Sequence, residues 1–161
     1  ADQWNQLADT LQARYQAKVI AFGKSDQLSN SRLVIEQLSS KIISTIDQTS
    51  LPEAMSLLKR CNLFVGPDSS LLHLASCMGV NVIGLYGPTP SDYNYPYLHR
   101  KNIVRTQKNL DCMPCYPSLS YCPCKRSPAS GACMEALATE AVLGLIEQEL
   151  SLSDARRTGH S

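Results

Sequence analysis

The sequence lacks any apolar stretch that approaches the length of a membrane-spanning helix. It also lacks an excess of charge of one sign, because 15 Lys and Arg face 14 Asp and Glu, for a formal net charge of +1. This balance excludes a broad basic surface for a nucleic-acid backbone, and no polybasic run is present for a membrane surface. The first residues have neither the basic nor the apolar region of a signal peptide. The chain begins at Ala1 rather than Met, so we expect it to be a piece of a longer protein.

No Gly-x-Gly-x-x-Gly follows the first apolar run, which argues against a dinucleotide cofactor. The chain has 161 residues, of which 43% are apolar and 18% charged. That is the size of one globular domain that can bury a core without the help of disulfide bonds or metals. We expect residues 1–150 to form this domain. Residues 151–161 have almost no apolar content, and we expect them to be a disordered tail.

Short apolar runs alternate with segments of helical periodicity along the chain. The runs predict strands at 18–22, 42–46, 62–65, 81–86 and 102–105, and the periodic segments predict helices at 2–15, about 30–38, from 51, 70–78 and 135–150. The strands are apolar on both faces, which is typical of a parallel sheet buried between helices. The sequence therefore predicts a Rossmann-like three-layer α/β/α fold. Such sheets bind ligands at the carboxyl ends of their strands, so the loops after Phe22, Val65 and Tyr86 are the candidates.

The loop after Val65 contains Asp68, Ser69 and Ser70 and leads directly into the helix predicted at 70–78. The unpaired N–H groups at a helix start form a natural anion site, and the two serines add hydroxyl donors. The loop therefore suits a diphosphate without a metal, and Asp68 could accept hydrogen bonds from sugar hydroxyls. The alternative is that Asp68 or Ser69 only caps the helix.

His73 lies on the same face of this helix as Ser70 and is expected to point back toward the helix start. Its neighbours in the sequence are apolar. One interpretation is a donor to a phosphate oxygen or a support for the loop. The other is a buried histidine that hydrogen-bonds to the backbone.

Two further loops are candidates. In the loop of Gly87, Pro88 and Thr89, glycine permits a close approach to the backbone and Thr89 offers a hydroxyl and an N–H, although a rigid turn without a ligand is the common alternative. In the loop after Phe22, Asp26 could hold a ribose hydroxyl. A polar loop at that position needs no function.

Five of the seven cysteines gather between residues 112 and 133, namely Cys112, Cys115, Cys122, Cys124 and Cys133. Cysteines grouped in this way can hold zinc or iron tetrahedrally, with Cys112, Cys115, Cys124 and Cys133 as the candidate ligands. Packed thiols and a disulfide are the alternatives. The spacing completes no compact zinc-finger pattern.

Together these segments resemble the C-terminal domain of the family 9 glycosyltransferases, the bacterial heptosyltransferases. That family has an Asp-Ser/Thr-Gly-x-x-His-x-x-Ala segment followed by Phe/Tyr-Gly-Pro-Thr. Here residues 68–76 read DSSLLHLAS and residues 86–89 read YGPT, with LPEAM before them at 51–55. Many members also carry the Cys-x-Pro-Cys and Cys-Met elements seen at 112–115 and 133–134. The resemblance covers about residues 4–150.

The resemblance implies the C-terminal half of a GT-B glycosyltransferase that binds a nucleotide-sugar donor, usually ADP-heptose, for lipopolysaccharide core synthesis. Asp68 would contact the sugar, Ser69 and Ser70 the diphosphate, and His73 would support them. The loop of residues 87–89 would line the pocket, and Asp26 would match the family's ribose ligand. The transfer would need no metal. The protein would be cytoplasmic, with at most peripheral contact with the inner face of the bacterial inner membrane.

Ser70 departs from the family pattern, because a glycine usually occupies that position. We expect the acceptor domain and its catalytic base to lie outside these 161 residues, so the chain alone would bind donor weakly and be inactive. Two competing hypotheses are a non-catalytic α/β interaction module with a Cys-bound structural metal, and another nucleotide-binding Rossmann-like enzyme.

Overall fold

A computed structural model describes all residues except 26–35, 109, 111, 114, 116–130 and 159–161. The chain divides into two compact units, Ala1–Ser56 and Leu57–Ser161. The boundary falls inside helix α3 (Leu51–Leu58). The sequence predicts one domain over residues 1–150.

The first unit begins with α1 (Asp2–Tyr15), which buries Leu7 and Ala8. Strands β1 (Ile20–Ala21) and β2 (Ile43–Ser44) pair in parallel. The side chain of Asn5 holds the segment before β2, since its Oδ1 accepts the N–H of Ser39 at 2.8 Å. The first predicted helix and both strands are confirmed, with shorter strands. The helix predicted at about 30–38 falls largely outside the described residues.

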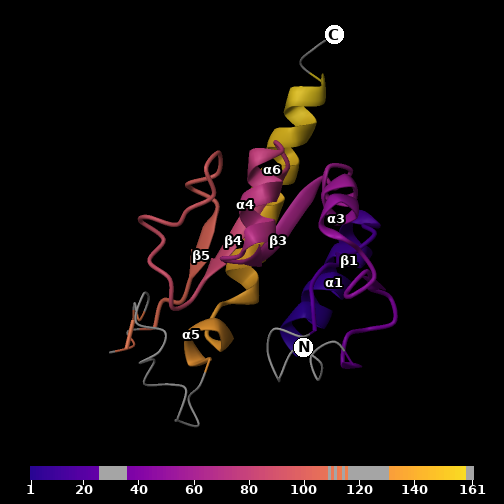
Figure 1. Cartoon of the computed structure of the whole chain (residues 1–161). Helices are drawn as coiled ribbons and strands as arrows, with labels where there is room; N and C mark the ends of the chain where they lie inside the picture. The colour runs from indigo at the N-terminus through magenta and orange to yellow at the C-terminus, as the bar shows by residue number, and fades with distance from the viewer. Residues whose placement is uncertain (26–35, 109, 111, 114, 116–130, 159–161) are drawn as a thin grey trace. The chain divides into compact units, whose positions relative to one another are not determined.

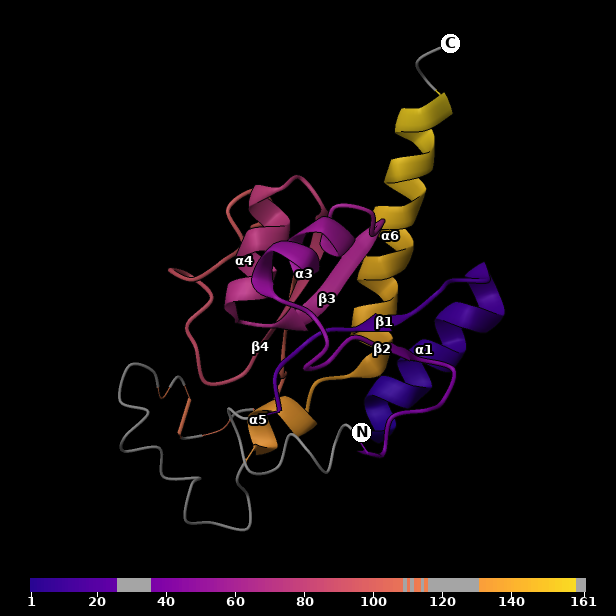
Figure 2. The same cartoon turned by 45° about the vertical axis from the view of Figure 1, so that its right-hand side comes forward.

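The second unit contains a parallel sheet in the order β3 (Leu63–Pro67), β4 (Asn81–Tyr86) and β5 (Ile103–Arg105). Helix α4 (Ser70–Cys77) links β3 to β4 and covers one face of the sheet. Helix α6 (Thr139–Thr158) packs against β4 on the opposite face, as Figures 1 and 2 show. This unit therefore has the three layers and the parallel strands that the sequence predicts.

The central strand β4 carries the core of this unit. Val82, Ile83, Leu85 and Tyr86 are all buried, because helices cover both faces of the strand. Gly84 leaves room for α4: a Cβ there would lie 3.3 Å from Cδ2 of Leu72 and even closer to the ring of Tyr86. Helix α4 then ends before Gly79, whose φ of 77° suits the residue after a helix.

The C-terminal part differs from the prediction. The helix expected at 135–150 is two helices, a single turn α5 (Ala132–Glu135) and the long α6. The helix expected to end at residue 150 continues to Thr158, so the prediction of a tail from 151 is wrong up to that residue. No glycine or proline interrupts residues 145–158, and the hydroxyl of Ser151 bonds to the carbonyl of Glu147 within the helix. Helix propensity therefore outweighs the low apolar content.

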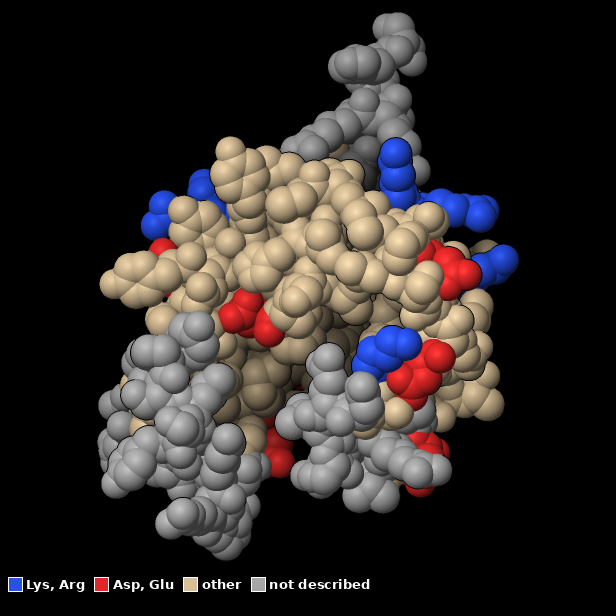
Figure 3. Space-filling view, viewed as in Figure 1, with Lys and Arg blue, Asp and Glu red and all other residues tan. Residues whose placement is uncertain are grey.

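Within the described part of the chain, no helix combines the length and the hydropathy needed to cross a membrane. In Figure 3, the Lys and Arg side chains of described residues lie in small separate groups rather than in a continuous basic surface.

Candidate functional site

The three parallel strands of the second unit end at one edge of their sheet. The register pairs Pro67 with Leu85 and Tyr86 with Arg105. Because parallel strands share a direction, the segments that follow them emerge at the same edge. Asp68, the loop from Gly87 and the end of β5 are therefore brought together, as the sequence predicts for Asp68 and Gly87.

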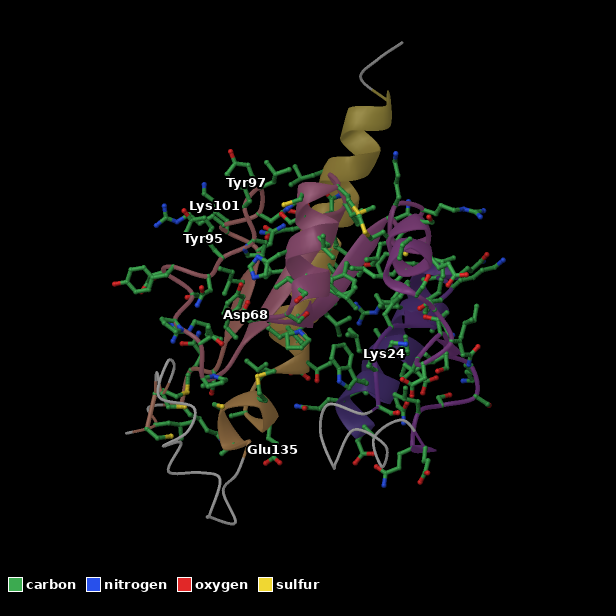
Figure 4. The ribbon with its side chains drawn as sticks, in the orientation of Figure 1. Lys24, Asp68, Tyr95, Tyr97, Lys101 and Glu135 are labelled. Carbon is green, nitrogen blue, oxygen red and sulfur yellow. The ribbon has the colours of Figure 1, made fainter. Side chains whose placement is uncertain are left out.

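Asp68 pairs with His73 at this edge. Nε2 of His73 lies 2.9 Å from Oδ1 of Asp68, and the side chains are 40% and 20% exposed, respectively. The ring thus points back toward the start of α4, as predicted, and it contacts a carboxylate. The alternative of a buried histidine bonded to backbone is wrong. In Figure 4, Asp68 lies at the end of α4 that is nearer to α5.

The N-cap residue of α4 leaves the first turn of the helix without a side-chain capping bond. Ser69 is the N-cap residue with extended backbone, φ −156° and ψ 162°, and its side chain makes no capping hydrogen bond. The first N–H groups of a helix have no acceptor within the helix. Ser70 is exposed and Ser69 half-buried. The hypothesis that the Ser69 side chain serves only as a cap is therefore not supported, whereas diphosphate binding by the two serines stays a prediction.

Tyr86 ends β4 and is fully buried. Its hydroxyl donates a hydrogen bond to the carbonyl of Asn94. Burial, and to a lesser extent the negative charge of Asp68, raises the pKa of Tyr86 well above its ordinary value. Sequence reasoning placed Tyr86 only in a core strand. Its position beside the Asp68 carboxylate follows from the pairing of β3 with β4, which the sequence alone does not show.

The loop of residues 87–89 packs against α5. A Cβ at position 87 would lie 2.6 Å from Sδ of Met134 and 2.9 Å from Sγ of Cys133. The N–H of Cys115 donates to the carbonyl of Pro88 at 3.1 Å. Thr89 is only 9% exposed. The structure thus gives an internal reason for glycine at position 87, while contact of this loop with a donor stays a prediction.

Arg105 is a residue at this edge that the sequence analysis did not single out. Its Nη1 donates to the hydroxyl of Ser91 at 3.2 Å. This bond joins the end of β5 to the segment two residues after Thr89. Because an arginine at the end of a short strand has no distinctive pattern, the sequence offered no signal for it.

The loop after β1 belongs to the first unit. Asp26 lies outside the described residues, so its predicted role as a ribose ligand stays a prediction. The described part of this loop is held by Asp47, whose carboxylate accepts the N–H of Ser25 at 3.0 Å. Hydrogen bonds from the side chain and backbone of Ser25 lower the pKa of the Asp47 carboxyl, and Lys24 adds to that direction. Asp47 has a φ of 60°, a conformation that aspartate tolerates better than most residues.

The cysteine segment is described only in part. Among the described residues, no group of three or more His, Cys, Asp and Glu side chains could hold a metal ion. Cys122 and Cys124 lie outside them. The four-cysteine zinc or iron site therefore stays a prediction that the arrangement of Cys112, Cys115 and Cys133 does not by itself support.

Comparison with known proteins decides the family. The model of glycosyltransferase family 9 (heptosyltransferase) matches residues 1–125. The chain belongs to this family. It is similar to lipooligosaccharide heptosyltransferase 2 of Haemophilus influenzae, 34% identical over 44% of this chain and 20% of that protein. The same-named protein of Campylobacter jejuni serotype O:6 is 21% identical over 92% of this chain and 45% of its own length. The family 9 chain thus spans less than half of the relatives that it matches.

A solved structure supports the fold of this family 9 chain. A glycosyl transferase family 9 protein from Veillonella parvula matches 92% of this chain and 40% of its own chain, with a TM-score of 0.69 and 23% sequence identity. The predicted α/β fold with parallel strands is therefore confirmed.

Proposed function

We propose that this chain is the nucleotide-sugar-binding half of an inverting heptosyltransferase of lipopolysaccharide core synthesis, with the GT-B architecture. The chain belongs to family 9, and the observation that carries the proposal is what lies at the carboxyl ends of β3 and β4. Asp68 and the start of α4, where Ser69 makes no side-chain capping bond, follow β3, and the loop from Gly87 follows β4. Open α/β sheets bind ligands at such an edge.

In this proposal the donor diphosphate lies at the start of α4. The N–H groups of the first turn and the hydroxyls of Ser69 and Ser70 hold the phosphate oxygens. As the bond to the sugar breaks, negative charge grows on the leaving nucleoside diphosphate, and these fixed donors stabilise it without a metal. Asp68 accepts hydrogen bonds from sugar hydroxyls, and His73 fixes the orientation of its carboxylate.

The acceptor hydroxyl and the base that deprotonates it belong to the acceptor domain in this scheme. Attack from the side opposite the diphosphate inverts the anomeric centre. We therefore propose that this chain binds ADP-heptose or a similar donor weakly and does not turn over alone. Such a protein would work in the cytoplasm, where nucleotide sugars are used, beside the inner face of the membrane.

Calorimetric titration with ADP and with ADP-heptose tests the proposal. We expect the wild-type chain to prefer ADP-heptose, because in this proposal the hydroxyls that donate to Asp68 belong to the heptose and not to the ribose of ADP. Asp68→Asn removes the charged acceptor, and it should lower affinity for ADP-heptose by about ten-fold or more while changing that for ADP little. Asp92→Asn is the matched control, since Asp92 is exposed in the same unit.

Two results would contradict the proposal. One is the absence of binding of either nucleotide to the wild-type chain. The other is equal affinity of wild type and Asp68→Asn for ADP-heptose.

A further inference from the structure

Gly87 packs closely against α5 near the candidate site. A methyl group at position 87 would lie 2.6 Å from Sδ and 3.0 Å from Cγ of Met134, and 2.9 Å from Sγ of Cys133. Real Cβ atoms essentially never approach other atoms below 3.0 Å. The two sulfur-bearing side chains therefore occupy the space that any other residue at position 87 would need.

We infer that Cys133 and Met134 are positioning residues that fix the Gly87–Thr89 loop for donor binding. The inference rests on the proposed function, because the donor is what the loop would contact. It assigns a role to the Cys-Met element that neither a metal site nor general core packing requires.

The element is itself held firmly enough to act in this way. The turn of α5 begins at Gly131, whose φ is 88° and whose carbonyl accepts the N–H groups of Met134 and Glu135 at 2.8 and 3.0 Å. Cys133 is only 8% exposed. The N–H of Leu137 then bonds to the carbonyl of Met134, and Leu137 is buried just before α6, which packs on β4. The position of the sulfur atoms is thus tied to β4, the strand that directly precedes Gly87.

A second contact holds the next residue of the loop. The carbonyl of Pro88 accepts the N–H of Cys115 at 3.1 Å. Consecutive residues are thereby fixed from two different segments, and Thr89 follows them nearly buried. A loop held in this way presents its backbone to a ligand without an ordering cost at binding. Displacement of the loop by one methyl group should therefore weaken the donor complex.

The test is Gly87→Ala in two backgrounds, wild type and Cys133→Ala/Met134→Ala. In wild type the added methyl would lie within 3.0 Å of both sulfur atoms, so the loop or the Cys133 and Met134 side chains must shift. Because Cys133 is buried, we expect the loop to shift and affinity for ADP-heptose to fall by about ten-fold. In the double-alanine background the sulfur atoms are gone, and the same substitution should cost less than about three-fold. Thermal unfolding of every variant confirms that affinities are compared where each protein is folded.

Gly144→Ala is the matched glycine control, because a Cβ at position 144 of α6 meets nothing within 4 Å. It should leave affinity unchanged. An equal loss from Gly87→Ala in both backgrounds would overturn the inference, since the methyl would then clash with the donor rather than with α5. A wild-type chain that binds neither ADP nor ADP-heptose would overturn the proposed function and this inference with it.

Discussion

His73 holds the carboxylate of Asp68 at 2.9 Å across the first turns of α4, five residues along the chain. In the proposed function this bond orients Asp68 toward the sugar, so its loss should lower the affinity for the donor. We expect His73→Ala to lower affinity for ADP-heptose by about five- to ten-fold, because a hydrogen bond to a charged group is lost and the carboxylate becomes mobile. Calorimetry with ADP-heptose measures the change.

His73→Gln provides the comparison for this prediction, because its side-chain amide can also donate to the carboxylate of Asp68. It should retain more of the affinity than His73→Ala. If both variants bind ADP-heptose as wild type does, the pair has no role in orienting the donor.

Tyr86 should remain un-ionised until strongly alkaline pH. Its pKa is raised above the ordinary value of 10, first by burial and then by the charge of Asp68. Since burial favours the neutral phenol in the folded state, its contribution to stability is complete below pH 10 and is lost as the pH rises beyond it. Tyr86→Phe should therefore make the free energy of unfolding fall less steeply above pH 10. Urea unfolding at several alkaline pH values measures this slope.

At neutral pH, Tyr86→Phe should also cost about 1–2 kcal/mol, because the carbonyl of Asn94 loses its donor. Tyr97→Phe is the control, since Tyr97 is 78% exposed. Equal stability of Tyr86→Phe and wild type at every pH would contradict both the hydrogen bond and the raised pKa.

Ser76 anchors the loop between β4 and β5. Its hydroxyl is fully buried near the end of α4, lies 3.0 Å from Nδ1 of His99 and accepts the N–H of Leu98 at 3.2 Å. Ser76→Ala should lower the free energy of unfolding by about 1–3 kcal/mol, because a backbone donor loses its acceptor. Chemical denaturation measures this loss in the free energy of unfolding. Ser56→Ala removes a similar but exposed hydroxyl from α3, and a loss as large as that of Ser76→Ala would refute the anchoring role.

The elements of the fold could be predicted from the sequence where local patterns and burial agree. Strand β4 is apolar and central, so its bounds match the prediction at both ends. Strands β1 and β2 are shorter than predicted, because a run of apolar residues shows that a strand can form but not how much of it finds a partner. The sequence predicts a last helix that is too short, because low apolar content after residue 150 indicates disorder, whereas helix propensity extends α6 to Thr158.

The candidate site could be predicted only as separate loops. The order of residues identified Asp68 and His73 as candidates, and the direction of the His73 ring follows from its place three residues after Ser70 on one face of the helix. The bond between Asp68 and His73 was not predicted and is supplied by the structure. The packing of Met134 on Gly87, 47 residues apart, depends on the tertiary fold and has no local signal. The same is true of the bond between Arg105 and Ser91.

The start of α3 offers a pH-dependent test of local structure. Oε2 of Glu53 accepts both the N–H of Ser50 at 2.8 Å and its hydroxyl at 2.6 Å, and the first of these bonds is one of the two that make up a capping box. These bonds lower the pKa of Glu53 below its ordinary value of 4.5. A depressed carboxyl pKa gives stability that is present above pH 4.5 and lost as the pH falls through the folded-state value. Glu53→Gln should therefore be less stable than wild type at neutral pH and equal to it in acid, as urea unfolding at several pH values would show. A constant difference across that range would mean that the Glu53 charge does not support the cap.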